Sequence, residues 1–142
     1  MQQRGAAEPV VVSVGFVSDE AGEGTAYGIT RRGFLETPFS VTFQAPMRPA
    51  LEGRDTGYAA LLAVGSYVRQ RGVRNVVFHF PDARVANDLK QRADVPAALT
   101  LPYIELRCSL NRFEDAEVVP LSAADADAVV ARAAAATLRT AA

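Results

Sequence analysis

The chain has 142 residues, of which 49% are hydrophobic, and a formal net charge of −1. This length and apolar fraction fit one domain with its own core, so we predict a single domain over residues 1–142, with 1–8 flexible. With a net charge near zero, the protein has no overall electrostatic attraction to nucleic acid or to an anionic membrane, which excludes the class of proteins that bind through net positive charge. Cys108 and His79 are the single cysteine and histidine, which excludes an internal disulfide and argues against a zinc site.

The sequence also bears on location. Its longest apolar stretches are interrupted by Gly, Arg or Pro, and residues 1–9 lack a basic start followed by an apolar run. We therefore expect a cytoplasmic protein that makes no membrane contact. The abundance of Ala and Arg resembles that of a GC-rich bacterial coding sequence, so we expect a bacterial source.

The first part of the chain predicts an antiparallel meander of three strands. The run VVVSVGFV at 10–17 is apolar on both faces and rich in β-branched residues, as in a central strand. A second strand, at 25–32, follows an acidic, Gly-rich loop. In the third, at 39–45, apolar and polar residues alternate, which indicates one buried face. Strands this close in sequence favour antiparallel neighbours.

The second part predicts alternating helices and strands. A helix starts at Asp55 or Thr56, either of which can cap it, and ends at Gly72. A capping box at Ser122 starts the last helix. Its predicted inward face comprises Ala126, Val129, Val130, Ala133 and Thr137. Between these helices we predict a strand at 76–80, a helix opened by Pro81 and Asp82, and a fifth strand at 101–106. The result is an α/β fold with a mixed five-stranded sheet and helices on its faces.

Four short motifs resemble the ribonuclease H-like superfamily, in particular its type 1 ribonuclease H domains. The sequence AYGI at 26–29 resembles the start of the family's second strand, and GYAALL at 57–62 resembles its first helix. Residues 76–89 are similar to its fourth strand and next helix, and NRFED at 111–115 to a late Asn-to-Asp element. The resemblance spans about residues 10 to 137 and implies the ribonuclease H-like fold.

The resemblance also implies a catalytic centre, in which four carboxylates hold two magnesium ions that cleave RNA in an RNA–DNA hybrid. At the matching positions, Asp82 falls on a serine of the family, and the fourth acid is Asp115 or Asp127. The other three acid positions hold residues that cannot ligate a metal through a side chain, namely Gly15, Gly57 and Pro81. The predicted centre is therefore degenerate.

Each remaining acid also has a structural interpretation. Asp82 can cap the helix that follows it, and Asp115 can be an ordinary loop acid. Asp127 lies with Asp125 in the first turn of a helix, where the dipole favours acids. We therefore assign no catalytic residue and no metal site, and expect no cofactor unless Asp82, Asp115 or Asp127, with Asp19, forms a relocated magnesium site. His79 in a strand and Cys108 after one are expected to be structural.

Basic side chains are frequent between the first and second helices. They predict either a nucleic-acid-binding patch or a solvated surface interleaved with acids. Some family members insert an additional basic helix before the fifth strand, and residues 93–100 are too few for it. The candidate nucleic-acid-binding residues are Arg69, Arg71, Arg74, Arg84, Lys90 and Arg92.

Three hypotheses for function follow. The first is a non-catalytic ribonuclease H-like module, a pseudoenzyme that binds nucleic acid or protein. The second is an active magnesium-dependent nuclease for RNA–DNA hybrids with relocated carboxylates, which requires those carboxylates to converge. The third is a homo-oligomeric protein-interaction domain, a homodimer in the simplest case, for which exposed Phe34, Leu35 and Phe39 on an edge strand would provide the apolar surface.

Overall fold

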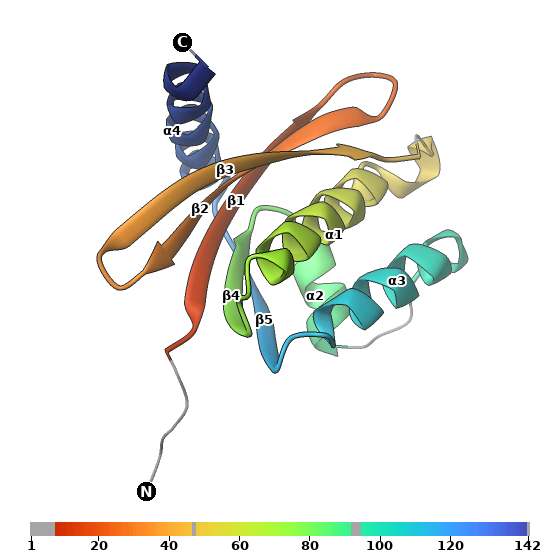
Figure 1. Ribbon diagram of the computed structural model, residues 1–142. Coiled ribbons are helices and arrows are strands. Elements are labelled where there is room, and N and C mark those ends of the chain that lie inside the picture. The colour runs from red at the N-terminus through yellow and green to blue at the C-terminus, as the bar shows by residue number, and fades with distance from the viewer. Residues whose placement is uncertain (1–7, 47, 92–94, 142) are drawn as a thin grey trace, which may run out of the picture.

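The computed structural model describes residues 8–46, 48–91 and 95–141, so the segment predicted to be flexible lies outside it except for Glu8 (Figure 1). Its centre is a five-stranded sheet with the order β3-β2-β1-β4-β5. The first three strands form the predicted antiparallel meander, and the last two run parallel to β1. The strands are β1 (Val10–Ser18), β2 (Glu23–Arg32), β3 (Leu35–Gln44), β4 (Asn75–Phe80) and β5 (Asp115–Pro120).

Helices cover both faces of the sheet. On one face α1, α2 and α3 lie together, with α1 packed against β3 and β2, while α4 lies on the other face against β1, β2 and β3 (Figure 1). The mixed α/β architecture predicted from the sequence is therefore confirmed. The helices are α1 (Arg54–Gln70), α2 (Ala83–Gln91), α3 (Thr100–Leu110) and α4 (Ala123–Ala141), and short 3₁₀ turns occupy Pro49–Leu51 and Ala97–Leu99.

The alternation of β1 explains this layering. Val12 and Val14 are fully buried and belong to the same core cluster as Leu61 of α1. Gly15, between them and the strand's end, faces α4 instead, directly against Ala126. Because successive residues of a strand point to opposite faces, one short apolar run supports a helix layer on each side of the sheet.

The predicted fifth strand at 101–106 was wrong, because these residues belong to α3. Leu101 is 78% exposed, whereas Leu106 and Leu110 are buried at helical spacing. Pro102 lies in the first turn, where the missing N–H costs no helical hydrogen bond. A short apolar run does not distinguish a buried strand from part of a helix, and packing decides between them. The fifth strand is β5, which starts at Asp115.

This reassignment also corrects two related predictions. A helix does lie between α2 and the fifth strand, because α3 starts at Thr100 rather than within residues 93–100. It is not a basic helix, since Arg107 is the one Lys or Arg in its sequence. Cys108, predicted to follow a strand, lies exposed in the same helix.

The expected cap of α1 was also wrong. The N-cap is Gly53, whose φ of 87° lies in the left-handed region that glycine adopts without strain. Asp55 is instead buried in the first turn, where its carboxylate accepts two hydrogen bonds from Arg48, at 2.6 and 3.1 Å. Arg48 therefore binds the Asp55 carboxylate that the sequence had predicted to cap the helix.

One further surface prediction changes, and one cap is confirmed. Phe39 is buried and stacks on Tyr67 with ring centroids 4.4 Å apart, although Phe34 and Leu35 are exposed as expected. The Ser122 hydroxyl accepts the Asp125 N–H at 3.1 Å, as the capping box predicted.

The inward face of α4 is narrower than predicted. Ala126, Val129 and Ala133 are buried, whereas Val130 is half-buried. Thr137 is exposed and its hydroxyl donates to the Ala133 carbonyl at 3.0 Å. Over residues 8–46, 48–91 and 95–141, no helix is long and apolar enough to cross a membrane.

Candidate functional site

The carboxyl ends of the central strands β1 and β4 meet in an apolar cluster. Phe16 of β1 stacks on Phe80, the last residue of β4, with centroids 5.5 Å apart, and meets Phe43 edge-on at 6.2 Å. Beside it is a small pocket of about 240 Å³ whose lining includes Pro81 and one acid, Asp127. In open α/β sheets, ligands bind beyond the carboxyl ends of the strands, so this is the first place to look for a site.

Gly15 lies on the α4 side of this region and leaves no room for a side chain. A Cβ at this position would be 2.6 Å from the carbonyl oxygen of Ala126 and 2.7 Å from a methyl of Val130. The backbone of α4 therefore occupies the space into which a side chain at position 15 would project.

Gly57 lies on the opposite face. A Cβ there would be 2.9 Å from both Asp82 Oδ2 and a methyl of Val85, at the start of α2. Gly15 and Gly57, which the resemblance assigned to one centre, are therefore separated by the sheet. Spacing along the chain locates a residue on a strand, but strand register and side-chain direction decide which face it serves. On the α1 face of β1, Phe16 lies at the end of β4, where its ring stacks on Phe80.

Asp82 is held by its own helix. Its Oδ1 accepts the N–H of Arg84 at 3.0 Å, which confirms the predicted N-cap. Both oxygens also accept from the Arg84 guanidinium, at 3.1 and 3.0 Å, and the same guanidinium donates to the carbonyl of Glu52 at 3.0 Å. The hydrogen bond with Asp82 is the main cause that raises the pKa of Arg84. An internal cation thus already binds this carboxylate.

The three candidate acids do not meet. Asp115 pairs with Asn75, the first residue of β4, whereas Asp82 follows its last residue, Phe80. At about 3.3 Å per residue, these two ends of β4 lie about 17 Å apart. Asp127 lies near the same end of β4 as Asp82, but on the α4 side of the sheet, in the pocket with Pro81. Within the described ranges, no three His, Cys, Asp or Glu side chains form a group that could hold a metal ion.

Two buried carboxylates near the start of α1 are also bound by arginines. Asp88 accepts from Arg54 at 2.9 Å and from the Tyr58 hydroxyl at 2.7 Å. Burial and then the Asp88 hydrogen bond raise the pKa of Tyr58 above its ordinary value. With Asp55 bound to Arg48, this end of the molecule contains acids and arginines in pairs. Sequence reasoning missed the Arg54–Asp88 pair, because 34 residues separate its members, and it assigned Asp55 to a cap.

The predicted basic patch is only partly assembled. Arg84 is bound to Asp82, and Arg74 pairs with Glu114 at 3.1 Å. Arg69 and Arg71 lie at the end of α1, where Arg71 stands over the Tyr67 ring at 4.7 Å. Arg92 lies outside the described residues, and Lys90 lines a groove beside β5.

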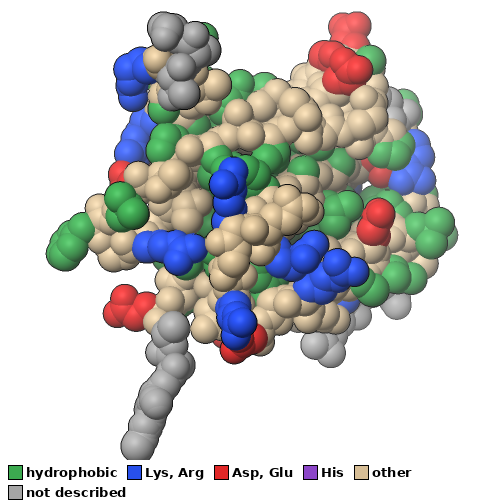
Figure 2. Space-filling model, viewed as in Figure 1, with side chains coloured by type: hydrophobic (Ala, Val, Ile, Leu, Met, Phe, Trp, Pro, Cys, Tyr) green, Lys and Arg blue, Asp and Glu red, His purple; other side chains and the backbone are tan. Residues whose placement is uncertain are grey.

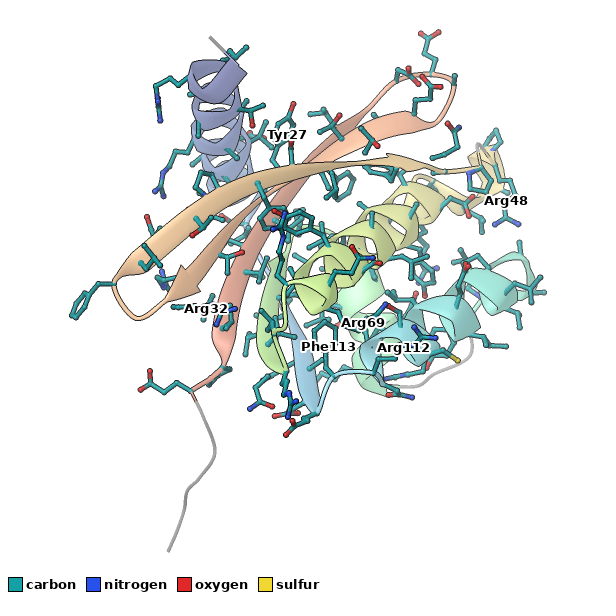
Figure 3. All side chains as sticks on the ribbon, in the orientation of Figure 1. Tyr27, Arg32, Arg48, Arg69, Arg112 and Phe113 are labelled. Carbon is teal, nitrogen blue, oxygen red and sulfur yellow. The ribbon has the colours of Figure 1, made fainter. Side chains whose placement is uncertain are left out.

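Arg112, which sequence analysis did not select, joins the end of α1. Packing of α3 on α1 brings it to the region of Arg69 (Figure 3). Neither residue forms an ion pair with a described carboxylate. Figure 2 shows Lys and Arg side chains across the middle of this face, with few acids among them. The strand predicted at 101–106 concealed this neighbourhood, because only a helix there brings Arg112 toward α1.

Comparison with known proteins defines the class of fold. No family model and no curated protein matches the sequence. Solved structures do match, and a ribonuclease H1 from the halophilic archaeon Halobacterium salinarum NRC-1 superimposes with a TM-score of 0.64 at 17% identity. That match covers 89% of this chain and 97% of the other. The chain therefore has a ribonuclease H-like fold, as its motifs predicted.

Two further structures agree. The N-terminal ribonuclease H domain of rv2228c from Mycobacterium tuberculosis, as a fusion with maltose-binding protein, has a TM-score of 0.61 at 15% identity, with 96% of this chain and 100% of that chain covered. The ribonuclease H1 called LC11, isolated from compost by a metagenomic approach, has a TM-score of 0.60 at 9% identity, with 85% and 89% covered. The same architecture thus accommodates very different sequences.

Proposed function

We propose that the protein is a non-catalytic ribonuclease H-like module that binds a partner. The observation that carries this proposal is the filling of the region at the ends of β1 and β4. Phe16 and Phe80 stack there, and the neighbouring Asp82 is bound through both oxygens by Arg84. Magnesium requires several oxygen ligands in tight octahedral geometry, and these side chains do not supply them. The residues present therefore do not fit a pair of magnesium ions.

Hydrolysis of a labelled RNA–DNA hybrid tests this proposal. With 10-fold or greater excess of protein and either Mg²⁺ or Mn²⁺, we expect no cleavage above a protein-free blank. The variant Arg84→Gln releases Asp82 from its guanidinium and is expected to remain inactive, because Gly15 and Gly57 still provide no ligand. Metal-dependent cleavage that disappears in Asp82→Asn, Asp115→Asn or Asp127→Asn would establish the relocated nuclease instead.

A specific observation favours nucleic acid as one partner. Arg69 and Arg112 lie near each other at the end of α1 (Figure 3), and Arg71, which ends the same helix, stands over Tyr67. None of the three has a carboxylate partner among the described residues, and the structures with this fold named above are ribonucleases H. Arginines of this kind bind phosphates, and the affinity then falls as salt rises. The proposed surface comprises these three residues rather than the whole predicted patch.

Fluorescence anisotropy with a labelled hybrid, measured over a salt series, tests this surface. Arg112→Glu is expected to lower the slope of log affinity against log salt by about 1. Arg139→Glu, an equal charge change on exposed α4, is the matched control and is expected to leave the slope unchanged. Equal effects of both substitutions, or no binding by the native protein, would contradict a phosphate-binding surface at the end of α1.

A further inference from the structure

The outer edge of β5 has unpaired backbone groups. The sheet order ends at β5, and its one neighbour is β4. The N–H groups of Asp115 and Leu121 donate to carbonyls on the β4 side, at 3.3 and 2.8 Å. Alternate residues of a strand direct their backbone groups to the same neighbour, so Ala116 and Val118 present N–H and C=O outward. No described strand pairs with this edge.

A groove of about 560 Å³ runs along this edge, between β5 and α2, and the end of α3 closes one end of it. We call it the β5 edge groove. Leu89, Leu110 and Phe113 contribute to its lining, and the side chains of Ala116 and Val118 pack toward the core on the same side. Polar side chains such as Asn87 and Arg107 line the groove as well. An unpaired strand edge therefore lies beside a groove with both apolar and polar side chains, an arrangement that can bind an added strand.

Charge distinguishes the two faces of this edge. Asp115 and Glu117 are exposed, and neither forms an ion pair with another described residue. Glu117 is paired in register with Val77, on the face opposite Val118. Lys90 and Arg107 line the groove, where they disfavour a further cation, while the edge residues Asp115 and Glu117 border it. A strand placed here would therefore meet carboxylates on one face and, on the other, apolar side chains with two cations beside them.

We propose that the β5 edge groove binds an extended peptide segment in which basic residues alternate with apolar ones, by adding it to the sheet as a sixth strand. The peptide backbone would pair with Ala116 and Val118, its apolar residues would face the groove, and its basic residues would face Asp115 and Glu117. Pro120 has no N–H and ends the edge, so about four peptide residues can pair. This inference rests on the proposed binding role and specifies its partner.

A second copy of this chain is a poor occupant of the same edge. In an antiparallel pair of two β5 edges, paired residues point to the same face, and the registers centred on Ala116 or Glu117 place Glu117 opposite Asp115 or Glu117 of the other copy. Like charges directly opposite one another destabilise a strand pair. The acids that would attract a basic peptide therefore disfavour these registers of self-association, as charges on natural edge strands do.

Binding of a fluorescein-labelled Lys-Val-Lys-Val-Lys-Val peptide tests the proposal. We expect saturable binding by the native protein, no measurable binding of the matching Glu-Val peptide, and loss of binding when alternate peptide nitrogens are methylated on the pairing edge. Amide hydrogen exchange at Ala116 and Val118, followed by NMR, should slow when the peptide is added. Unchanged exchange at both amides, or equal binding of the methylated peptide, would overturn strand addition.

The variant Glu117→Lys should weaken binding of the Lys-Val peptide by about fivefold, the effect of one cross-strand charge pair gained or lost. Glu105→Lys is the matched control, since Glu105 is exposed on α3 outside the groove. If both variants weakened peptide binding equally, the effect would come from the overall charge of the protein, and the assignment of the peptide to the β5 edge groove would be overturned. Hybrid cleavage in the assay above would overturn the non-catalytic role while leaving the peptide result intact, so the two failures are distinguishable.

Discussion

The carboxyl ends of the central strands and the outer edge of β5 are opposite in character. At the first, Gly15 and Gly57 allow helices to approach until no side chain fits, and aromatic rings fill the remaining space. At the second, a strand edge lies beside a groove and two exposed acids have no described ion-pair partner. The comparison teaches that two proteins with the same fold need not have open space for a ligand at the same place.

The largest expected effect is at the filled centre. Gly15→Asp would force a side chain against the Ala126 carbonyl, 2.6 Å from the added Cβ, and would bury a charge. We expect the free energy of unfolding, measured in urea, to fall by about 4 kcal/mol. Glu117→Lys on the exposed edge is the contrasting variant and should change it by less than about 0.5 kcal/mol. Similar losses for both would remove the distinction between the two regions.

The second-largest expected effect is at the buried carboxylates that arginines bind near the start of α1. Asp88→Asn leaves the guanidinium of Arg54 without its buried counter-charge, and we expect a loss of about 3 kcal/mol in unfolding free energy. Glu36→Gln, which breaks the exposed pair with Arg132, is the control and should cost less than about 0.5 kcal/mol. If Asp88→Asn left the unfolding free energy unchanged, the pair of Asp88 with Arg54 would contribute no more to stability than an exposed pair.

Two glycines of the same helix permit a closely matched test of packing. Gly57→Ala brings a methyl within 2.9 Å of Asp82 and Val85, so we expect a loss of about 1.5 kcal/mol. At Gly65 the nearest atom is 4.0 Å from an added Cβ, and Gly65→Ala should stabilise by about 0.5 kcal/mol through its effect on the unfolded chain. Calorimetric melting of the two variants checks whether their effects have opposite signs.

The buried tyrosine predicts a pH effect of similar size. Because burial and Asp88 raise the pKa of Tyr58 in the folded state, the unfolded chain loses this proton at a lower pH, near 10. Stability is therefore retained below pH 10 and falls above it, by about 1.4 kcal/mol at pH 11. Unfolding free energies of native and Tyr58→Phe proteins should diverge by this amount. Parallel pH profiles would show that Tyr58 ionises equally in both states.

Local pattern was enough for most of the fold. The alternation in 39–45 and the β-branched run at 10–17 identify strands because a strand exposes alternate residues to different surroundings. The helical spacing that follows 46–54 identifies α1 in the same way. At 101–106 the pattern failed, since LPYIEL contains apolar residues in both periods and only contact with α1 selects the helix.

The candidate site was less accessible to such reasoning. Counting residues placed Gly15 and Gly57 together, yet they face opposite sides of the sheet. The pairing of Asp88 with Arg54 and the approach of Arg112 to α1 join segments that lie far apart in the chain. Neither contact produces a periodic pattern in the sequence, because a charged residue of a type usually found at the surface can be buried when the fold places an opposite charge beside it.

Residue identities alone were enough to predict the ribonuclease H-like fold and the meander, because both are properties of short segments, and they also led to the prediction that three positions of the family's centre hold no acid. The three-dimensional arrangement decided everything that depends on direction and distance. It set which face each glycine serves, assigned an arginine to each buried acid, and left the edge of β5 without a described partner. These outcomes arise from strand register and helix packing, which bring together residues that no local pattern connects.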